Sequence, residues 1–350
     1  MEIDEQYMWR CLELAQYGRF DVAPNPMVGS VLVYKDKIIG EGYHRRCGEG
    51  HAEVNAIASV KDEALLRQAT MYVSLEPCSH YGKTPPCVEL ILSKGIPRVV
   101  VACLDPFVKV AGRGVKRLRD AGVEVVTGVL EKEAQKLNVL FMTAHRLRRP
   151  YVLLKWAQSV DGFMDGYRKD KSTKPIHFSN TIRLQYNHRK RAEFQAIMVG
   201  TNTVLLDNPS LINRLWSGRP PLRVTMDFKN RLMPSLHLLD DPFPTLIFSF
   251  TKEQTCQHLT YIKINETEPL LPQMLTILYK KGINSLIVEG GSMLLNSFID
   301  AGLWDECQVE RAPVQLKEGV VSPDIEKAAG IFKCVEINRF GTSHTLKYYK

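Results

Sequence analysis

The chain contains the stretch Glu76-Pro-Cys-Ser-His-Tyr-Gly-Lys-Thr-Pro-Pro-Cys87, and the tripeptide His51-Ala-Glu53 precedes it. One histidine and two cysteines, His51, Cys78 and Cys87, suit a tetrahedral Zn²⁺ and leave its fourth position for water. Glu53 follows the histidine by two residues, so its carboxyl group stands beside that water without binding the metal. It can take the water's proton and pass it to a leaving amine. The sequence therefore predicts a zinc site with a general acid/base next to it.

The order of these residues is the one that zinc nucleobase deaminases share, His-x-Glu followed by Pro-Cys-x-x-Cys. Here eight residues separate Cys78 from Cys87, and they are rich in Gly and Pro, so the loop can fold back to the metal. Taken singly, each cysteine is as well explained as a small buried side chain, and His51 as a structural histidine. All four residues in order, at helix and strand ends, indicate a metal site instead.

Strand-like and helix-like segments alternate around this site, which predicts an α/β sandwich. Strands are expected at 28–34, 38–39, 71–75, 99–103 and 123–127, and helices at 4–17, 52–60, 87–94, 114–121 and 131–147.

A basic stretch that ends in proline, Arg146-Leu-Arg-Arg-Pro150, is the best candidate for a domain boundary. A second α/β pattern follows it, with strands expected at 151–156, 196–199, 222–226, 245–250 and 285–288 and helices at 183–193, 271–281 and 292–301. We therefore expect two domains, 1–145 and 150–350, each long enough to bury its own core.

Composition excludes several classes of protein. The chain is 45% apolar and 24% charged, and no run approaches the ~18 apolar residues that a membrane span needs. Its acidic start is unlike a secretory signal, and its 8 cysteines are too sparse for a disulfide scaffold. We expect a cytoplasmic protein with reduced cysteines and no membrane partner.

The net charge of +8 is concentrated in one segment. Residues 1–145 carry 18 Lys+Arg against 18 Asp+Glu, residues 192–350 carry 16 against 17, and residues 146–191 carry 12 against 3. A nucleic-acid-binding protein spreads its positive charge along a face or tail, so we expect no nucleic-acid partner. The basic segment either attracts the phosphates of small molecules or is a solvated linker with an exposed helix face.

Further matches make the first half resemble the deaminase half of the bifunctional riboflavin-biosynthesis deaminase/reductase family. They are Pro24-Asn-Pro-Met-Val-Gly29, Gly42-Tyr-His44, Asp105-Pro106 and Ala111-Gly-Arg-Gly114, and the long loop between the cysteines is the normal form in this family. The resemblance implies a cytidine-deaminase-like α/β/α sandwich, zinc on His51, Cys78 and Cys87, and proton transfer by Glu53.

The same resemblance implies a substrate pocket lined by Asn25, His44, Lys83 and Asp105, with Lys83 as a phosphate partner. Two of these residues have simpler explanations, since Asn25 lies between prolines and suits a turn, and His44 precedes two arginines and suits the surface. Phe107 departs from the family, which usually has Asn at this position, so we leave it out of the site.

The second half has no Gly-x-Gly-x-x-Gly after a strand, which disfavours a Rossmann fold. Two glycine-bearing segments lie at the ends of expected strands, Val199-Gly-Thr-Asn-Thr-Val-Leu-Leu-Asp-Asn-Pro209 and Val288-Glu-Gly-Gly-Ser-Met-Leu-Leu295. Gly290-Gly291 begins a helix, whose exposed N–H groups suit a phosphate, although tight turns before helices use glycine as well.

Together with Leu154-Lys-Trp-Ala-Gln-Ser-Val-Asp-Gly162, Pro221-Leu-Arg-Val-Thr-Met-Asp227 and Ala301-Gly-Leu-Trp-Asp-Glu306, these segments resemble the reductase half of the same family. The resemblance implies a dihydrofolate-reductase-like α/β domain that uses NADPH. It places Ala157, Thr203, Asp207 and Gly291 at the cofactor, and Arg191, Leu211, Arg214 and Glu289 at the ribose phosphate of the substrate. The simpler explanation of Asp207 is a helix cap or turn residue.

Two departures stand out in the second half. The family often has a Ser/Gly-rich segment that ends in Ser-x-Trp-Ile, whereas this chain has Tyr167-Arg-Lys-Asp-Lys-Ser-Thr-Lys-Pro-Ile-His-Phe178, with His177 where the Trp would be. Phe228 stands where a small polar residue is common. These changes leave open whether the second domain reduces its substrate.

We therefore expect a fused enzyme of riboflavin biosynthesis with two sequential reactions. Zinc-dependent hydrolytic deamination of 2,5-diamino-6-ribosylamino-4(3H)-pyrimidinone 5′-phosphate precedes NADPH-dependent reduction of 5-amino-6-(5-phosphoribosylamino)uracil to the ribityl product. We also expect a homo-oligomer, a dimer or a tetramer.

Three alternatives remain. One is an active deaminase fused to an impaired, reductase-like binding or regulatory module. A deaminase of tRNA or single-stranded nucleic acid is disfavoured by the neutral first half and the length of the metal loop. A purely structural zinc protein is disfavoured because such a site is closed by four ligands, whereas Glu53 stands beside an open one.

Overall fold

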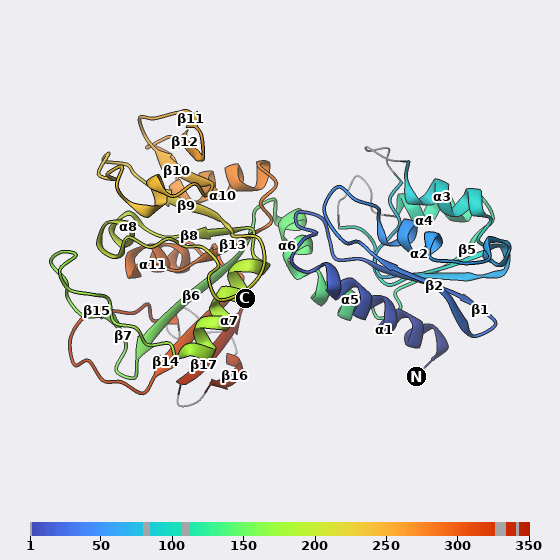
Figure 1. Cartoon of the computed structure of the whole chain (residues 1–350), viewed down its shortest axis with the longest axis horizontal. Coiled ribbons are helices and arrows are strands. Elements are labelled where there is room, and N and C mark those ends of the chain that lie inside the picture. Colours follow the sequence, from blue (N-terminus) through green and yellow to red (C-terminus); the bar gives the residue numbers. More distant parts are fainter. Residues whose placement is uncertain (1, 80–84, 107–111, 326–333, 341–342) are drawn as a thin grey trace. The chain divides into compact units, whose positions relative to one another are not determined.

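The computed structural model describes residues 2–79, 85–106, 112–325, 334–340 and 343–350, without the side chains of 334–340. The chain divides into two compact units, Met1–Arg148 and Arg149–Lys350 (Figure 1). Each unit is described by itself.

The first unit is built on a five-stranded sheet in the order β2-β1-β3-β4-β5. Strands β3, β4 and β5 are parallel, and β1 is antiparallel to both β2 and β3. The strands are β1 (Gly29–Tyr34), β2 (Lys37–Tyr43), β3 (Thr70–Val73), β4 (Arg98–Val101) and β5 (Glu124–Thr127). The helices are α1 (Ile3–Ala15), α2 (Ala52–Ala58), α3 (Cys87–Lys94), α4 (Arg113–Asp120), α5 (Glu131–Leu137) and α6 (Val139–Leu147), with 3₁₀ turns η1 (Gln16–Gly18) and η2 (Glu63–Gln68).

Helices cover both faces of this sheet, because successive strand residues point to opposite sides. Met71, Val73, Val99 and Val101 pack with α2, α3 and α4 in one apolar cluster. Their neighbours Tyr72 and Val100 pack with α1, α5 and α6 in the other. Strands buried on both faces read as continuous apolar runs, as residues 99–103 do in this sequence.

One expected helix is interrupted. We predicted a single helix over 131–147, but α5 ends at Leu137 and α6 begins at Val139. Between them Asn138 leaves helical geometry, and its side chain accepts a hydrogen bond from the Met27 N–H (2.8 Å) and donates one to the Met27 carbonyl (2.8 Å). The break follows from this long-range pairing of an amide with main chain, which the local pattern does not contain.

The second unit is built on a ten-stranded sheet in the order β11-β12-β10-β9-β8-β13-β6-β14-β17-β16, with β15 and β7 forming a separate pair. Neighbouring strands from β12 to β14 run parallel, while β11, β17 and β16 pair antiparallel at the two ends.

The strands of this unit are β6 (Tyr151–Ser159), β7 (Phe163–Asp165), β8 (Ala196–Met198), β9 (Leu222–Met226), β10 (Thr245–Ser249), β11 (Gln254–Cys256), β12 (Leu259–Lys263), β13 (Ser285–Val288), β14 (Glu306–Ala312), β15 (Val320–Val321), β16 (Cys334–Phe340) and β17 (Ser343–Tyr349). The helices are α7 (Thr181–Glu193), α8 (Thr201–Asp207), α9 (His237–Asp240), α10 (Leu270–Lys280) and α11 (Ser292–Asp300).

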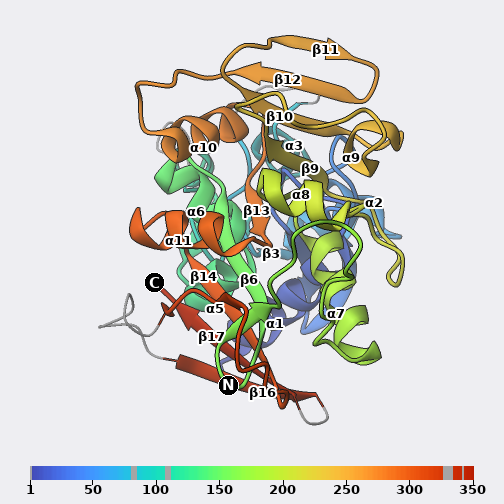
Figure 2. The same cartoon turned by 90° about the vertical axis from the view of Figure 1, so that its left-hand side faces the viewer.

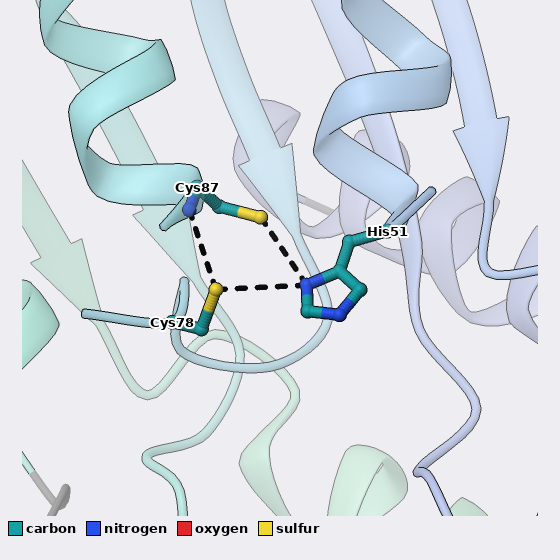
Figure 3. A group of neighbouring side chains, drawn as sticks. All are labelled: His51, Cys78 and Cys87. Carbon is teal, nitrogen blue, oxygen red and sulfur yellow. Dashed lines mark hydrogen bonds between the residues drawn. The ribbon is translucent and has the colours of Figure 1, made fainter. Parts of the chain in front are cut away.

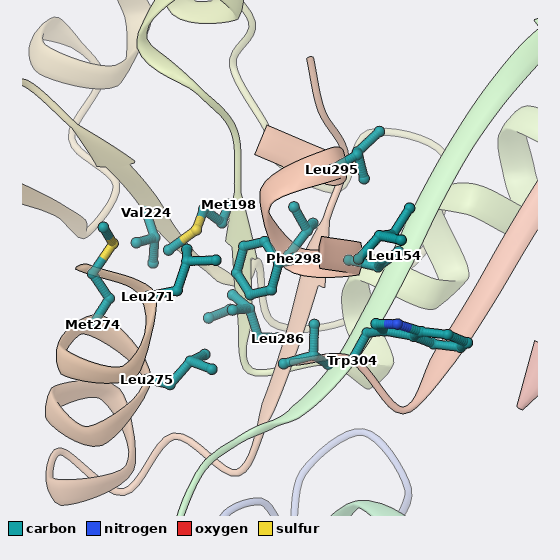
Figure 4. Close-up of a cluster of buried hydrophobic side chains, with 14 of the residues drawn as sticks. Leu154, Met198, Val224, Leu271, Met274, Leu275, Leu286, Leu295, Phe298 and Trp304 are labelled. Carbon is teal, nitrogen blue, oxygen red and sulfur yellow. The ribbon is translucent and has the colours of Figure 1, made fainter. Parts of the chain in front are cut away.

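The two faces of the large sheet differ in character. Leu154, Val224 and Leu286 point to the face that α10 and α11 cover, where they pack with Phe298 and Trp304 in an apolar core (Figure 4). Figure 2 shows α7 on the other side of the strands. Among the residues that alternate with the core set on β6, β9 and β14, several are polar and buried, namely Lys155, Arg223, Thr225, Gln308 and Glu310, beside apolar ones such as Leu153.

The sequence did not predict β14, although this strand lies inside the sheet. From Glu306 to Glu310 its polar and apolar side chains alternate, yet Cys307, Gln308, Val309 and Glu310 are all buried. Glu310 accepts a hydrogen bond from the Ser179 hydroxyl (2.6 Å) and lies 3.4 Å from the Arg183 guanidinium. Alternation of polar and apolar residues normally indicates a strand with one exposed face. The partners that allow the polar face of β14 to be buried are distant in the sequence, so the pattern of the strand alone does not reveal them.

Among the described residues, no helix combines the length and the apolar character that crossing a bilayer requires.

Candidate active sites

The predicted zinc ligands meet in the first unit. His51 is the N-cap of α2, Cys87 is the first residue of α3, and Cys78 lies in the connection after β3. The Nδ1 atom of His51 is 3.6 Å from Cys78 Sγ and 3.3 Å from Cys87 Sγ (Figure 3). An ion at Zn–S and Zn–N bond lengths with tetrahedral angles gives an N···S separation of about 3.5 Å. The three side chains therefore fit one Zn²⁺.

Cys78 is prepared to act as a thiolate ligand. Hydrogen bonding from the Cys87 thiol, and then from His51, lowers the pKa of Cys78 although burial acts in the opposite direction. The backbone N–H of Cys87 also donates to Cys78 Sγ over 3.3 Å. This N–H belongs to the first turn of α3, where main-chain donors have no partner inside the helix and stabilise a negative sulfur.

Glu53 lies in the first turn of α2, two residues after His51, and its side chain is buried. Burial raises the pKa of Glu53 to about 7. The charge of His51 and a hydrogen bond with the Cys87 side chain lower the pKa of Glu53 in part. Both residues are predicted zinc ligands, so the carboxyl group of Glu53 lies next to them. Geometry and position fit a group that exchanges a proton beside the metal.

His44 is buried rather than exposed, which excludes the simpler explanation of this residue. Its ring stands edge-on to that of His51, with centroids 5.3 Å apart. Nδ1 lies 3.1 Å from the Gly50 carbonyl, which can only accept, so Nδ1 carries the hydrogen. Burial lowers the pKa of His44, and its neutral Nε2 accepts from the Asn25 amide over 3.1 Å. Asn25 and His44 thus form a pair beside the metal ligands.

Glu76 is a residue whose role the sequence did not reveal. It is buried, and its carboxylate accepts four backbone hydrogen bonds: Asp105 (3.2 Å) and Gly112 (2.9 Å) donate to Oε2, and Gly114 (2.8 Å) and Val115 (3.1 Å) donate to Oε1. It therefore holds the predicted pocket residue Asp105 by its main chain and caps the start of α4. The predicted pocket residue Lys83 lies outside the described residues, as does Phe107, which we left out of the site.

In the second unit, the predicted cofactor residues gather at the carboxyl ends of parallel strands. Gly200 follows β8, and its N–H donates to the Gly290 carbonyl after β13 over 2.8 Å. A Cβ atom added to Gly291 would lie 3.4 Å from Thr203 Oγ1, so α8 and the start of α11 are in contact. Ala157 lies toward the same end of β6, which pairs with β13. This edge of a parallel sheet is where α/β proteins bind ligands.

Glu289 lies between two cations at this edge. Its Oε2 accepts from Arg191 of α7 over 2.7 Å, and its Oε1 lies 3.6 Å from Lys155 Nζ of β6. Burial alone would raise the pKa of Glu289, but the charges of Arg191 and Lys155 lower it to about 2. Burial lowers the pKa of Lys155. Sequence reasoning gave Lys155 no role; its signal is a lone lysine inside a strand that is otherwise apolar.

Two residues one turn apart on α7 hold the loop that carries Leu211 and Arg214. Arg191 Nη1 donates to the Ile212 carbonyl over 3.4 Å, and the Arg214 N–H donates to His188 Nδ1 over 3.0 Å. Burial, followed by the charges of Arg191 and Arg214, lowers the pKa of His188 to about 4, so its ring stays neutral and accepts. Leu211 has a buried side chain and a positive φ of 55°, while the Arg214 side chain is exposed.

Asp207 is the last residue of α8, not an N-cap, and it forms an ion pair with Arg168. Many cations of the basic segment 146–191 form ion pairs in the same way, each with a nearby carboxylate. The paired cations are Arg149, Lys155, Arg168, Arg183, Arg189, Lys190 and Arg191. Seven of the 12 cations of this segment therefore lie against carboxylates in the part of the chain that the structure describes.

The chain matches two families of known proteins, the RibD C-terminal domain over residues 150–345 and the cytidine and deoxycytidylate deaminase zinc-binding region over residues 1–103. It is 40% identical to riboflavin biosynthesis protein RibD of Bacillus amyloliquefaciens over 337 residues (94% of this chain, 89% of the relative). It is 38% identical to RibD of Escherichia coli strain K12 over 365 residues (97% of each chain).

Solved structures agree with these relatives. The structure of a diaminohydroxyphosphoribosylaminopyrimidine deaminase/5-amino-6-(5-phosphoribosylamino)uracil reductase from Thermotoga maritima is similar with a TM-score of 0.87 and 34% identity, covering 99% of this chain and 98% of that one. RibD of Acinetobacter baumannii is similar with a TM-score of 0.88 and 32% identity, over the same shares.

The role of Glu76 is testable by replacing it with glutamine. Glu76→Gln exchanges one acceptor oxygen for an NH₂ group, which leaves two buried N–H groups facing a donor. We expect the free energy of unfolding of the first unit to fall by roughly 3 kcal/mol, measured by denaturant titration. The control Glu89→Gln removes only a partly exposed pair with Arg117 and should cost less than about 1 kcal/mol. Equal losses in the two variants would contradict a capping role for Glu76.

Proposed function

This chain belongs to the RibD family, and from that premise we propose which of its residues carry out the family's two reactions. The chain is a bifunctional enzyme of riboflavin biosynthesis, a zinc-dependent deaminase joined to a reductase that uses NADPH. We assign deamination to residues 1–145 and reduction to residues 150–350. The substrates that we propose are those in the name of the Thermotoga relative, the diaminopyrimidine ribosyl phosphate and then the aminouracil ribosyl phosphate.

For deamination, we assign His51, Cys78 and Cys87 as the zinc ligands and Glu53 as the group that moves protons. When bound, Zn²⁺ supplies an activated water at neutral pH. Glu53 would take one proton from that water and deliver it to the ring nitrogen as the hydroxyl group adds to the ring carbon. It would then take a second proton from this hydroxyl group and deliver it to the leaving amine, so that the C–N bond breaks as the carbonyl forms. The observation that carries this assignment is the pair of N···S distances, 3.3 and 3.6 Å, with Glu53 buried two residues after His51 in the first turn of α2.

Asn25, His44, Lys83 and Asp105 are the proposed pocket residues. The neutral His44 takes one amide hydrogen of Asn25, which orients the amide so that Oδ1 is left to accept from an amino group of the pyrimidine. Glu76 supports Asp105 through its backbone. Lys83 keeps its predicted role as a phosphate partner.

For reduction, NADPH supplies the hydride that the ribosyl C1′ receives, and the protein's contribution is to position both molecules. We assign Ala157, Thr203, Asp207 and Gly291 to the cofactor, because they share one edge of the sheet. We assign Arg191, Leu211, Arg214 and Glu289 to the substrate. The exposed guanidinium of Arg214, on a loop that α7 holds by its main chain, suits a phosphate, while Leu211 contributes its backbone.

We also propose that the enzyme is a homo-oligomer, a dimer or a tetramer. The alternative of a catalytically impaired second domain is not favoured, because Thr203 and Gly291 lie close together and the chain is similar over its whole length to a protein named a deaminase/reductase.

The overall assignment is tested by incubating the protein with the diaminopyrimidine ribosyl phosphate, with and without NADPH, followed by mass analysis. We expect exchange of an amino group for oxygen in both samples, and the further gain of a hydride and a proton only with NADPH. Deamination alone in the presence of NADPH would instead support an impaired second domain.

The proton-transfer role predicts the behaviour of Glu53→Gln. This variant should keep its zinc, because Glu53 is not a ligand, while ammonia release falls by about 10²- to 10⁴-fold. Metal content by mass spectrometry and a coupled ammonia assay measure the two effects. Glu49→Gln, at an exposed position, is the matched control. Substantial activity in Glu53→Gln would rule out the assigned mechanism.

The phosphate role predicts the behaviour of Arg214→Ala. Loss of a charged hydrogen bond to the substrate should raise the KM of the reductase for its pyrimidine substrate about tenfold or more, while deamination is retained. The exposed Arg219→Ala on the same loop is the control and should change neither reaction. A parallel loss of deamination would point to general misfolding instead.

A further inference from the structure

The segment in which this chain departs from its family is tied to the rest of the second unit by Arg168. This residue follows β7, and its side chain is only 7% exposed. Its Nε donates to Asp165 Oδ2 over 2.7 Å, and its Nη2 contacts both Asp165 and Asp207 of α8. One guanidinium therefore joins β7 to the end of α8.

Asp165 closes the same segment into a loop. Its Oδ1 accepts from the N–H of Gly166 over 2.9 Å and from the N–H of Ile176 over 3.0 Å. The other oxygen of Asp165 is held by Arg168. The chain from 166 to 176 is thus fastened at both ends to one carboxylate, and Arg168 extends from this loop toward α8.

This contact lies at the edge of the sheet to which we assign NADPH. Thr203 and Asp207 are one turn apart on α8 and therefore share a face. A Cβ added to Gly291 would meet the Thr203 hydroxyl, and one added to Gly290 would lie 3.6 Å from Met164 Cε of β7. The β7 segment, α8 and the start of α11 thus surround the same place, and Arg168 reaches it from the side of the departing segment.

We propose that Arg168 is a positioning residue of the reductase: it holds the Asp207 carboxylate in one orientation, so that the oxygen it does not occupy faces a hydroxyl group of the cofactor. The proposal rests on the assignment of Asp207 to NADPH. Arg168 pairs with Oδ1 of Asp207, and the Asp207 side chain remains 27% exposed. Its other oxygen, Oδ2, is therefore left to accept a hydrogen bond from a ligand. A fixed carboxylate binds a hydroxyl with less loss of side-chain entropy than a mobile one.

The role of Arg168 bears on the segment 167–178, in which this chain departs from the family pattern. Where the family often has a Ser/Gly-rich segment, this chain places an arginine that pairs with a cofactor residue. The altered segment therefore keeps a fixed attachment to α8, and the reductase retains an ordered Asp207 despite His177.

The test is a double-mutant cycle with Arg168→Met and Asp207→Asn in the full-length protein, read by titrating NADPH and by steady-state kinetics. Arg168→Met should raise the Kd for NADPH about tenfold, which corresponds to about 1.4 kcal/mol, with little change in the KM for the pyrimidine substrate. If Arg168 acts through Asp207, its replacement should have almost no further effect in the Asp207→Asn background.

Two further variants complete the test. Arg168→Lys keeps the charge and should restore part of the affinity, while the exposed neighbour Lys169→Met should leave the Kd unchanged. Additive effects of Arg168→Met and Asp207→Asn would overturn the proposal, and so would tighter NADPH binding in Arg168→Met, which would mean that the ion pair obstructs the cofactor. A rise in the pyrimidine KM equal to that in Kd would also overturn it, because general disruption of the unit would then explain the loss.

Failure of this inference is distinguishable from failure of the proposed function. If the unaltered chain binds no NADPH, the assignment of the cofactor edge is wrong. If it binds NADPH and Arg168→Met binds it equally well, only the role of Arg168 is wrong.

Discussion

Parallel strand pairing is the constraint on which both sites depend. Two parallel neighbours cannot be joined by a tight hairpin, so the chain must cross over between them and each strand ends at the same edge of the sheet. In the first unit this brings the residues after β3 and β4, Cys78 and Asp105, to one edge. In the second it brings Ala157, Gly200 and Glu289 together from β6, β8 and β13. Each site therefore combines short local motifs, such as His51 with Glu53, with residues from distant parts of the chain.

Buried charge is the second organising feature of the reductase unit. The face of the large sheet opposite the apolar core carries Lys155 and Glu310, and surrounding cations form ion pairs with the carboxylates at that face and at its edge. Leaving one such charge without its partner costs about 3–5 kcal/mol, so the pairs fix how α7 and the strands lie against each other. The uneven charge along the sequence reflects this arrangement: the cations lie in 146–191, and acids such as Asp207, Glu289 and Glu310 follow later in the chain.

Much of the fold was predictable because its elements have clear periodicity. Helix α3 and strands β9 and β13 agree with the predicted ranges, since apolar runs and a terminal Gly95 mark them locally. Strand β14 and the break at Asn138 were not predictable, because each depends on a partner far along the chain, Arg183 in one case and Met27 in the other. In the sites, the zinc ligands followed from residue chemistry and spacing, whereas Glu76, Lys155 and Arg168 became visible only through their contacts.

The sequence by itself determined the chemistry that the chain can perform: the metal ligands and the neighbouring acid follow from residue types in a fixed order, because zinc accepts few donor sets and a proton carrier must stand beside them. The tertiary structure alone decided which polar groups are buried and what they face. It made His44 a neutral acceptor beside Asn25, paired Glu289 with Lys155 and Arg191, and brought Arg168 to Asp207. The physical reason is that a side chain's protonation, orientation and cost of burial depend on neighbours, and in a folded α/β chain those neighbours come from distant parts of the sequence.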